Sequence, residues 1–108
     1  MLHIRKIAGI DIGSNGVRLL IANVLEEEQE LPVFSKASLV RVPIRLGADV
    51  FEQGKISSEN AQRLQDTMQA YKLLMGVQGV EKYRACATSA MREAANGKAI
   101  TEQIAVHT

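Results

Sequence analysis

The chain has 108 residues, enough for one small domain that buries roughly two-thirds of the surface of the unfolded chain. Hydrophobic residues make up 46% of it and charged residues 23%, a balance typical of a globular domain rather than of a disordered or membrane-embedded chain. The formal net charge of +1 creates no global field for nucleic acid or an acidic membrane, so we expect neither as a partner and expect any bound anion to be held locally.

Two strands joined by a short turn open the chain. Ile4 to Ile12 and Val17 to Leu25 are rich in β-branched and aliphatic residues, and Gly13-Ser14-Asn15-Gly16 between them is suited to positive φ angles. The acidic stretch from Glu26 to Glu30 indicates a solvated turn, after which Val33 to Ile44 has the pattern of a third strand. We therefore expect an antiparallel meander of three strands.

A long amphipathic helix is predicted next, after a stretch from Gly47 to Lys55 that shows no clear period. Ile56-Ser57-Ser58-Glu59 resembles a helix start, with a hydroxyl cap and a carboxylate in the first turn. The helix is expected to end at Gly76. Before that end, apolar side chains recur at steps of three and four: Ala61, Leu64, Met68, Tyr71 and Met75.

The last part of the chain alternates between strand and helix. Val80 to Ala87 is predicted as a fourth strand, and the helix before it permits this strand to lie in the same sheet as the first hairpin. A short helix is expected from Thr88, and another helical segment from Lys98 to Val106. The order matches an α/β or α+β layer with helices on a mixed sheet, in which a fifth strand should follow the last helix. We therefore interpret the chain as one truncated domain.

The N-terminus, the cysteine and the histidines indicate where the protein is located and which covalent or metal links it can form. Met1 to Lys6 lacks the apolar region of a secretory signal, and no apolar run is long enough to cross a bilayer, so we expect a cytoplasmic protein. The single cysteine, Cys86, excludes an internal disulfide and is expected to be a buried strand residue. His3 and His107 form no ligand cluster with zinc spacing, and we expect both at the surface.

The turn between the first two strands carries the strongest indication of chemistry. It places Asp11 at a strand end, then a glycine-bearing turn whose N–H groups can face an anion, then Arg18 on the returning strand. A carboxylate beside bound phosphate is repulsive unless Mg²⁺ or a water intervenes, which suggests metal–phosphate chemistry. A P-loop and a dinucleotide fingerprint are both excluded, because a strand and not a helix follows the turn. A plain hairpin with an exposed aspartate is the alternative, and spacing alone does not decide between them.

Two further segments hold candidate ligands, each with an ordinary structural alternative. Thr88 and Ser89 would stand at the carboxyl end of the fourth strand as the start of a helix, with Arg92 one turn later in reach of a phosphate oxygen. A common helix cap with a solvated arginine explains the same residues. Arg45 lies between the third strand and the long helix. It either faces the candidate phosphate site or is an exposed surface charge, and we favour the exposed position.

Three segments, in this order and spacing, resemble the N-terminal domain of the exopolyphosphatase / guanosine pentaphosphate phosphohydrolase (Ppx/GppA) family. D-I-G-S-N-G-V-R-L is similar to its first phosphate loop, where a second serine more often stands in the place of Gly16. R-L-G-A-D-V-F-E-Q-G-K-I-S resembles its arginine-leucine-glycine connection, and A-T-S-A-M-R-E-A-A-N its fourth strand and following helix. The resemblance implies an α/β, actin-like ATPase (ribonuclease H-like) fold with a mixed sheet of order 3-2-1-4 that lacks its fifth strand. Residues 1–108 would be the N-terminal part of the first actin-like domain, with the second domain absent.

The resemblance also implies a function and residue roles. Members of the family hydrolyse the terminal phosphoanhydride of polyphosphate, or release the 5′ γ-phosphate of guanosine pentaphosphate, with Mg²⁺. Asp11 corresponds to the metal-site aspartate and Arg92 to a phosphate-contacting arginine. The first phosphate loop corresponds to Gly13, Ser14, Asn15 and Arg18. The family's catalytic glutamate and second glycine-rich loop would follow beyond Thr108, so we expect no catalytic residue in this chain and no turnover by the chain alone.

Two other functions remain consistent with the sequence. Another actin-superfamily enzyme, such as a sugar or acetate kinase, shares the first loop, although A-T-S-A-M-R-E argues against it. A phosphate-binding module without catalysis is the third possibility. We also expect a homo-oligomer, because the strand from Val80 to Ala87 would be a sheet edge without proline and with few charges.

Overall fold

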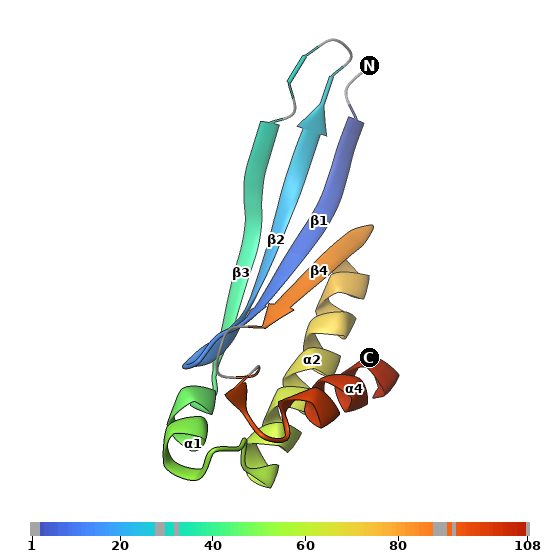
Figure 1. The fold of residues 1–108 in the computed structure, drawn as a ribbon. Helices are drawn as coiled ribbons and strands as arrows, with labels where there is room; N and C mark the ends of the chain where they lie inside the picture. Colours follow the sequence, from blue (N-terminus) through green and yellow to red (C-terminus); the bar gives the residue numbers. More distant parts are fainter. Residues whose placement is uncertain (1–2, 28–29, 32, 88–90, 92, 108) are drawn as a thin grey trace.

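The chain folds into one mixed β-sheet with helices on one of its faces (Figure 1). The computed structural model describes residues 3–27, 30–31, 33–87, 91 and 93–107. In chain order the elements are β1 (His3–Ile12), β2 (Gly16–Glu26), β3 (Val33–Pro43), α1 (Leu46–Gln53), α2 (Ser58–Gln78), β4 (Lys82–Ala87) and α4 (Gly97–His107).

The sheet has the strand order β3-β2-β1-β4, which confirms the order expected from the sequence. β1, β2 and β3 form the predicted antiparallel meander, whereas β4 pairs with β1 in parallel. The parallel pairing sets Ile12 opposite Ala87, so the carboxyl ends of β1 and β4 lie at the same end of the sheet. The β1–β2 turn lies there too, where ligand sites gather in sheets of this kind.

Alternation along the strands separates a buried face of the sheet from an exposed one. On β2, Val17, Leu19 and Ile21 are buried. Arg18 and Leu20, which stand between them, are exposed because successive side chains point to opposite faces. The buried face packs against α2 through the apolar stripe that the sequence predicts: Leu64, Met68, Tyr71 and Met75.

A buried hydroxyl ties α2 to the start of β2. The Tyr71 side chain is 1% exposed, and its hydroxyl donates to the carbonyl oxygen of Val17 at 2.6 Å. Burial raises the pKa of the Tyr71 phenol, although a hydrogen bond with the backbone of Val42 acts in the opposite direction. Because Val17 is the second residue of β2, this contact holds the strand directly beside the β1–β2 turn.

The middle of the chain differs from the sequence-based expectation at two points. α1 occupies much of the stretch from Gly47 to Lys55, for which no element was predicted, because its eight residues are too few to show a period. The left-handed Gly54, with φ 70°, ends it. α2 continues past Gly76 to its left-handed cap at Gly79, since one glycine costs a helix only about 1 kcal/mol relative to alanine.

Asn96 anchors the segment that leads into α4. Its side chain donates to the carbonyl oxygen of Ile56 at 2.8 Å and accepts from the N–H of the same residue at 2.9 Å. α4, which packs against α2, confirms the helix predicted from Lys98 to Val106. The short helix predicted from Thr88 begins outside the described residues.

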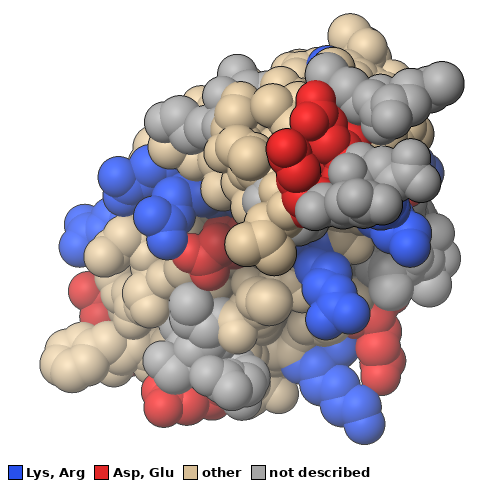
Figure 2. Space-filling view, turned by 90° about the horizontal axis from the view of Figure 1, so that it is seen from above, with Lys and Arg blue, Asp and Glu red and all other residues tan. Residues whose placement is uncertain are grey.

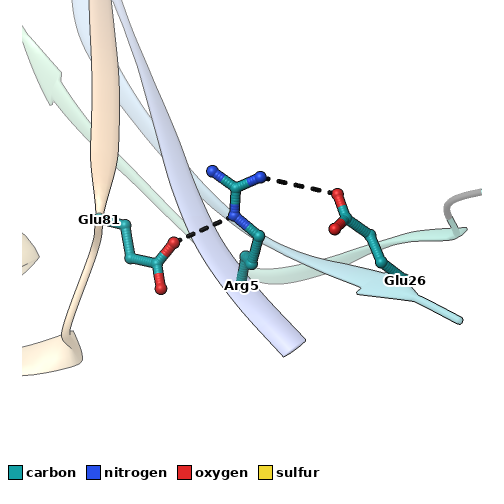
Figure 3. Close-up of polar contacts among 3 residues, drawn as sticks. All are labelled: Arg5, Glu26 and Glu81. Atoms are coloured by element: carbon teal, nitrogen blue, oxygen red, sulfur yellow. Dashed lines mark hydrogen bonds and ion pairs between the residues drawn. The ribbon is translucent and has the colours of Figure 1, made fainter. Parts of the chain in front are cut away.

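The far end of the sheet extends beyond the helices (Figure 1). The molecule measures 54 × 22 × 20 Å, and its radius of gyration of 15.9 Å exceeds the ~13 Å of a compact domain of this length. At this end Arg5 on β1 lies between Glu26 on β2 and Glu81 before β4, at 3.7 and 3.1 Å (Figure 3). All three side chains are partly exposed, so each pair contributes only about 0–1 kcal/mol to stability.

Candidate functional site

The β1–β2 turn closes a tight hairpin at the carboxyl end of β1. The Gly13 N–H donates to the carbonyl oxygen of Gly16 at 2.8 Å, and Ile12 pairs with Val17 below it. Neither Gly13 nor Gly16 adopts the positive φ angle to which the sequence of this turn is suited. Close approach explains the glycine at position 13 instead, since a Cβ there would lie 3.1 Å from the Gly16 carbonyl oxygen.

A cavity of about 200 Å³ opens beside this turn. Four residues that the sequence marks as phosphate or metal ligands line it together: Asp11, Gly13, Asn15 and Arg18. Gly16 and Arg41 complete its wall. The lining side chains thus include two guanidinium groups and one carboxylate, so the charge of the cavity favours an anion.

Ser14, the remaining residue of the turn, contacts the connection between β3 and α1. Its carbonyl oxygen accepts a hydrogen bond from the Gly47 N–H at 2.8 Å. A Cβ on Gly47 would lie 3.0 Å from the Ser14 Cβ, so glycine permits an approach that a larger residue would disturb. Arg45 in the same connection is exposed, as favoured from the sequence, and it does not line the cavity.

Asp11 and Arg18 form an ion pair on the wall of the cavity. They are cross-strand partners on β1 and β2, and the Arg18 guanidinium donates to Asp11 Oδ2 at 2.6 Å. Their side chains are 40% and 58% exposed, respectively. Water therefore screens the attraction between them, and a charged ligand can compete for either partner.

Asp11 is suited to be one ligand of a metal ion rather than part of a complete protein site. Among the residues that the structure describes, no three His, Cys, Asp or Glu side chains gather to hold a metal ion. Mg²⁺ needs only one or two protein carboxylates, because it keeps several waters and takes further oxygens from a bound phosphate. One accessible carboxylate on the wall of an anion-favouring cavity fits that mode of binding.

Asp49 on α1 is hydrogen-bonded to the start of α2. Its Oδ2 accepts three hydrogen bonds, from the N–H and the hydroxyl of Ser57 and from the Asn60 amide, at 2.9, 2.8 and 2.9 Å. Burial by itself would raise the pKa of Asp49, but these hydrogen bonds outweigh it and lower the pKa below its usual value. Ser57 is also the N-cap of α2, which confirms the hydroxyl cap predicted for this segment, and this network therefore joins α1 to α2.

The exposed face of the sheet continues from the cavity into an apolar groove of about 590 Å³. Leu20 and Leu39 are cross-strand partners in this groove and are 41% and 52% exposed. Cys86 also lines it and is exposed, so the prediction of a buried cysteine is wrong. Cys86 pairs with Asp11 on the sheet face that α2 does not cover, and β4 is little covered on either face, since every residue from Lys82 to Cys86 is exposed.

Surface charges at the end of the molecule seen in Figure 2 are mixed in sign. Lys and Arg side chains are interspersed there with Asp and Glu. This mixture of charges agrees with the formal net charge of +1. Across the described ranges, none of the helices has the length and apolar character needed to span a membrane.

The site expected from the sequence is only partly within the described residues. Arg92, Thr88 and Ser89 lie outside them. The register nevertheless brings Ala87, the last residue before this segment, opposite the end of β1 beside the turn. Sequence reasoning missed Arg41, because only the strand register shows that it faces Arg18.

The chain matches the model of the Ppx/GppA phosphatase family over residues 24–108. It is 32% identical over 98 residues to exopolyphosphatase 2 of Mycobacterium tuberculosis, in both the CDC 1551 / Oshkosh and the H37Rv strains. These alignments cover 88% of this chain and 30% of the relatives. The chain therefore spans less than a third of the length of the curated relatives it matches.

Solved structures share the fold of this chain. A Ppx/GppA family member from Aquifex aeolicus has a TM-score of 0.84 and 30% sequence identity, covering 94% of this chain and 32% of that one. An exopolyphosphatase from Cytophaga hutchinsonii has a TM-score of 0.80 over 95% of this chain and 31% of its own, and at 24% identity it supports the fold alone. These matches confirm the predicted α/β, actin-like ATPase fold.

Proposed function

Because the chain belongs to the Ppx/GppA phosphatase family, we propose that it forms one part of the phosphate-binding site of an exopolyphosphatase. The whole enzyme releases the terminal phosphate of inorganic polyphosphate. Guanosine pentaphosphate is the alternative substrate, because its 5′ γ-phosphate is held by the same kind of anhydride bond. The observation that carries this proposal is the cavity at the β1–β2 turn, where Asp11, Arg18 and Arg41 meet glycine-bearing backbone.

In this proposal the β1–β2 turn supplies donors to the phosphate oxygens. We assign the backbone N–H groups of Ser14 and Asn15 as donors to a bound phosphate. Gly13 contributes shape, because its N–H already donates within the turn and its missing Cβ keeps the turn tight. Arg18 supplies the charge-assisted hydrogen bonds, and its ion pair with Asp11 holds it beside the turn in the absence of ligand.

Hydrolysis spreads negative charge over the oxygens of the terminal phosphorus, so donors and cations placed around them lower the barrier. Arg18 performs this role in the proposed site, with Arg92 as a second arginine after β4. Asp11 is the proposed protein ligand of Mg²⁺, which supplies further charge neutralisation when bound. We assign the activation of water to a glutamate beyond Thr108, and therefore propose that residues 1–108 alone do not turn over substrate.

Phosphate release by the complete protein that contains this chain tests the proposal. With Mg²⁺ supplied, we expect release from long-chain polyphosphate or from guanosine pentaphosphate. R18Q should lower kcat/KM by about ten- to a hundredfold, because it removes a charged hydrogen-bond donor. K72Q, at an exposed position on α2, removes one positive charge away from the turn and should leave the rate unchanged. ATP-dependent phosphorylation of a sugar or acetate, without release from either substrate, would show a kinase instead.

A further inference from the structure

Arg41 stands directly opposite Arg18 on the exposed face of the sheet. The two residues are paired in the antiparallel register of β2 and β3, and both line the cavity at the β1–β2 turn. The Cβ atoms of such partners are about 4.5–5.5 Å apart, so the two guanidinium groups share one surface. Asp11 is the partner of Arg18 on its other side. Across β1, β2 and β3 the row is therefore a carboxylate followed by two guanidinium groups.

The charges of this row do not balance. Asp11 compensates Arg18 through the 2.6 Å ion pair, whereas within the part of the chain that the structure describes Arg41 forms no ion pair. Like charges directly opposite each other on neighbouring strands destabilise a sheet. An anion between Arg18 and Arg41 would neutralise the net positive charge and relieve the repulsion.

Gly16 leaves the space in which Arg41 approaches the turn. A Cβ on Gly16 would lie 3.2 Å from Nε of Arg41 and 3.2 Å from the carbonyl oxygen of Val42. The Val42 oxygen belongs to the backbone and cannot easily give way, whereas the Arg41 side chain can move. A larger residue at position 16 would therefore displace the Arg41 guanidinium from the turn.

We propose that Arg41 is a second phosphate-binding arginine of this cavity, positioned by Gly16, and that Arg18 and Arg41 clasp adjacent phosphate groups of one polyphosphate chain. This inference rests on the proposed function, because it takes the cavity to be a phosphate site. It adds a preference for linked phosphates over a single phosphate. Each guanidinium group can form charge-assisted hydrogen bonds to its own phosphate group of a linked chain, whereas orthophosphate offers only one group to both.

Nuclear magnetic resonance titration of the 108-residue chain, at fixed ionic strength, tests this preference with inorganic tripolyphosphate and orthophosphate as probes. Tripolyphosphate at millimolar concentration should shift the amide signals of the turn, and more strongly than orthophosphate. R41Q should raise the dissociation constant for tripolyphosphate about three- to tenfold, as expected for one exposed charged contact. R41K should restore part of the affinity, G16A should weaken it as R41Q does, and K72Q should bind like the unaltered chain.

Thermal unfolding gives a second readout that does not depend on the affinity itself. At low salt and without phosphate, R41Q should be at least as stable as the unaltered chain, because it removes the repulsion with Arg18. If R41Q binds tripolyphosphate normally while R18Q does not, Arg41 is no ligand and the proposed function stands. If the unaltered chain shows no shift with tripolyphosphate, the cavity is no phosphate site and both ideas are wrong.

Discussion

Tyr71 on α2 and Val17 on β2 are joined by a 2.6 Å hydrogen bond that lies one residue away from the turn of the proposed phosphate site. Y71F keeps the buried ring and removes the hydroxyl. We expect the free energy of unfolding to fall by about 1–2 kcal/mol, because the carbonyl oxygen loses a buried partner. Urea denaturation measures this change. Y83F, at a side chain that is 51% exposed, should change stability by less than about 0.5 kcal/mol, and equal losses in both variants would contradict the assigned role.

Asp49 predicts a dependence of stability on pH. Its pKa is lowered in the folded chain, so its contribution is present above the unfolded pKa and is lost as the pH falls through the lower, folded pKa. D49N should destabilise the chain at pH 7 by about 1–2 kcal/mol, because the charged acceptor of three hydrogen bonds is lost. The difference should narrow once the pH falls below about 4.

Chemical denaturation of both proteins at several pH values measures this difference. D66N is a matched control on the exposed side of α2, where the carboxylate accepts a single hydrogen bond from Gln62. It should change stability little at any pH. A gap between D49N and the unaltered chain that stays constant down to low pH would show that the charge of Asp49 is not responsible.

Two helical glycines should respond to alanine in opposite directions. At Gly97, a Cβ would overlap the carbonyl oxygen of Met91, so G97A must shift the start of α4 and should cost about 1–3 kcal/mol. At Gly76, inside α2, a Cβ would meet nothing within 4 Å, so G76A should stabilise the chain by about 0.5–1 kcal/mol. The melting temperatures of G97A and G76A, compared with that of the unaltered chain, test these opposite effects. A stabilised G97A would mean that the segment around Met91 packs differently.

Local patterns in the sequence predict much of this fold. The aliphatic and β-branched run from Val17 to Leu25 predicts β2, and the hydroxyls of Ser57 and Ser58 predict the start of α2, because both signals depend on residues a few positions apart. Contacts between residues far apart in the sequence cannot be predicted from such local patterns. The pair between Asn96 and Ile56 joins residues 40 positions apart, and only the strand register brings Arg41 opposite Arg18. The same limit explains why the exposure of Cys86 was not foreseen.

The exposure of the turn predicts that phosphate binds weakly to this chain. The Arg18 side chain is 58% exposed, and charge attraction at such a position is screened by water and salt. We therefore expect calorimetry of the 108-residue chain to show no tight binding of tripolyphosphate. Added salt should weaken binding further. A submicromolar dissociation constant would falsify the view that this turn needs further groups to complete its site.

β4 lies at one edge of the sheet. Within the described residues β4 pairs with β1 alone, so one side of its backbone offers unpaired N–H and C=O groups. Edge strands of this kind attract other strands unless proline, a bulge or charges prevent it, and β4 has no proline and only Lys82 and Arg84 as charges. Tyr83 on the same strand is 51% exposed and adds apolar surface. We therefore propose that the chain self-associates by pairing β4 with β4 of a second copy.

Sedimentation velocity over a range of concentrations tests this association, with a reductant present because Cys86 is exposed and could form a disulfide between copies. Y83K should shift the equilibrium toward the monomer, because it places a third charge on the edge. L73K adds the same charge to α2, at a side chain that is 72% exposed, and should leave the association unchanged. If L73K and not Y83K produces monomers, the interface is the outer face of α2 and not the sheet edge. A chain that stays monomeric at every concentration would show that the β4 edge is stable when exposed to solvent. The free energy gained by strand addition would then be smaller than the entropic cost of associating two chains.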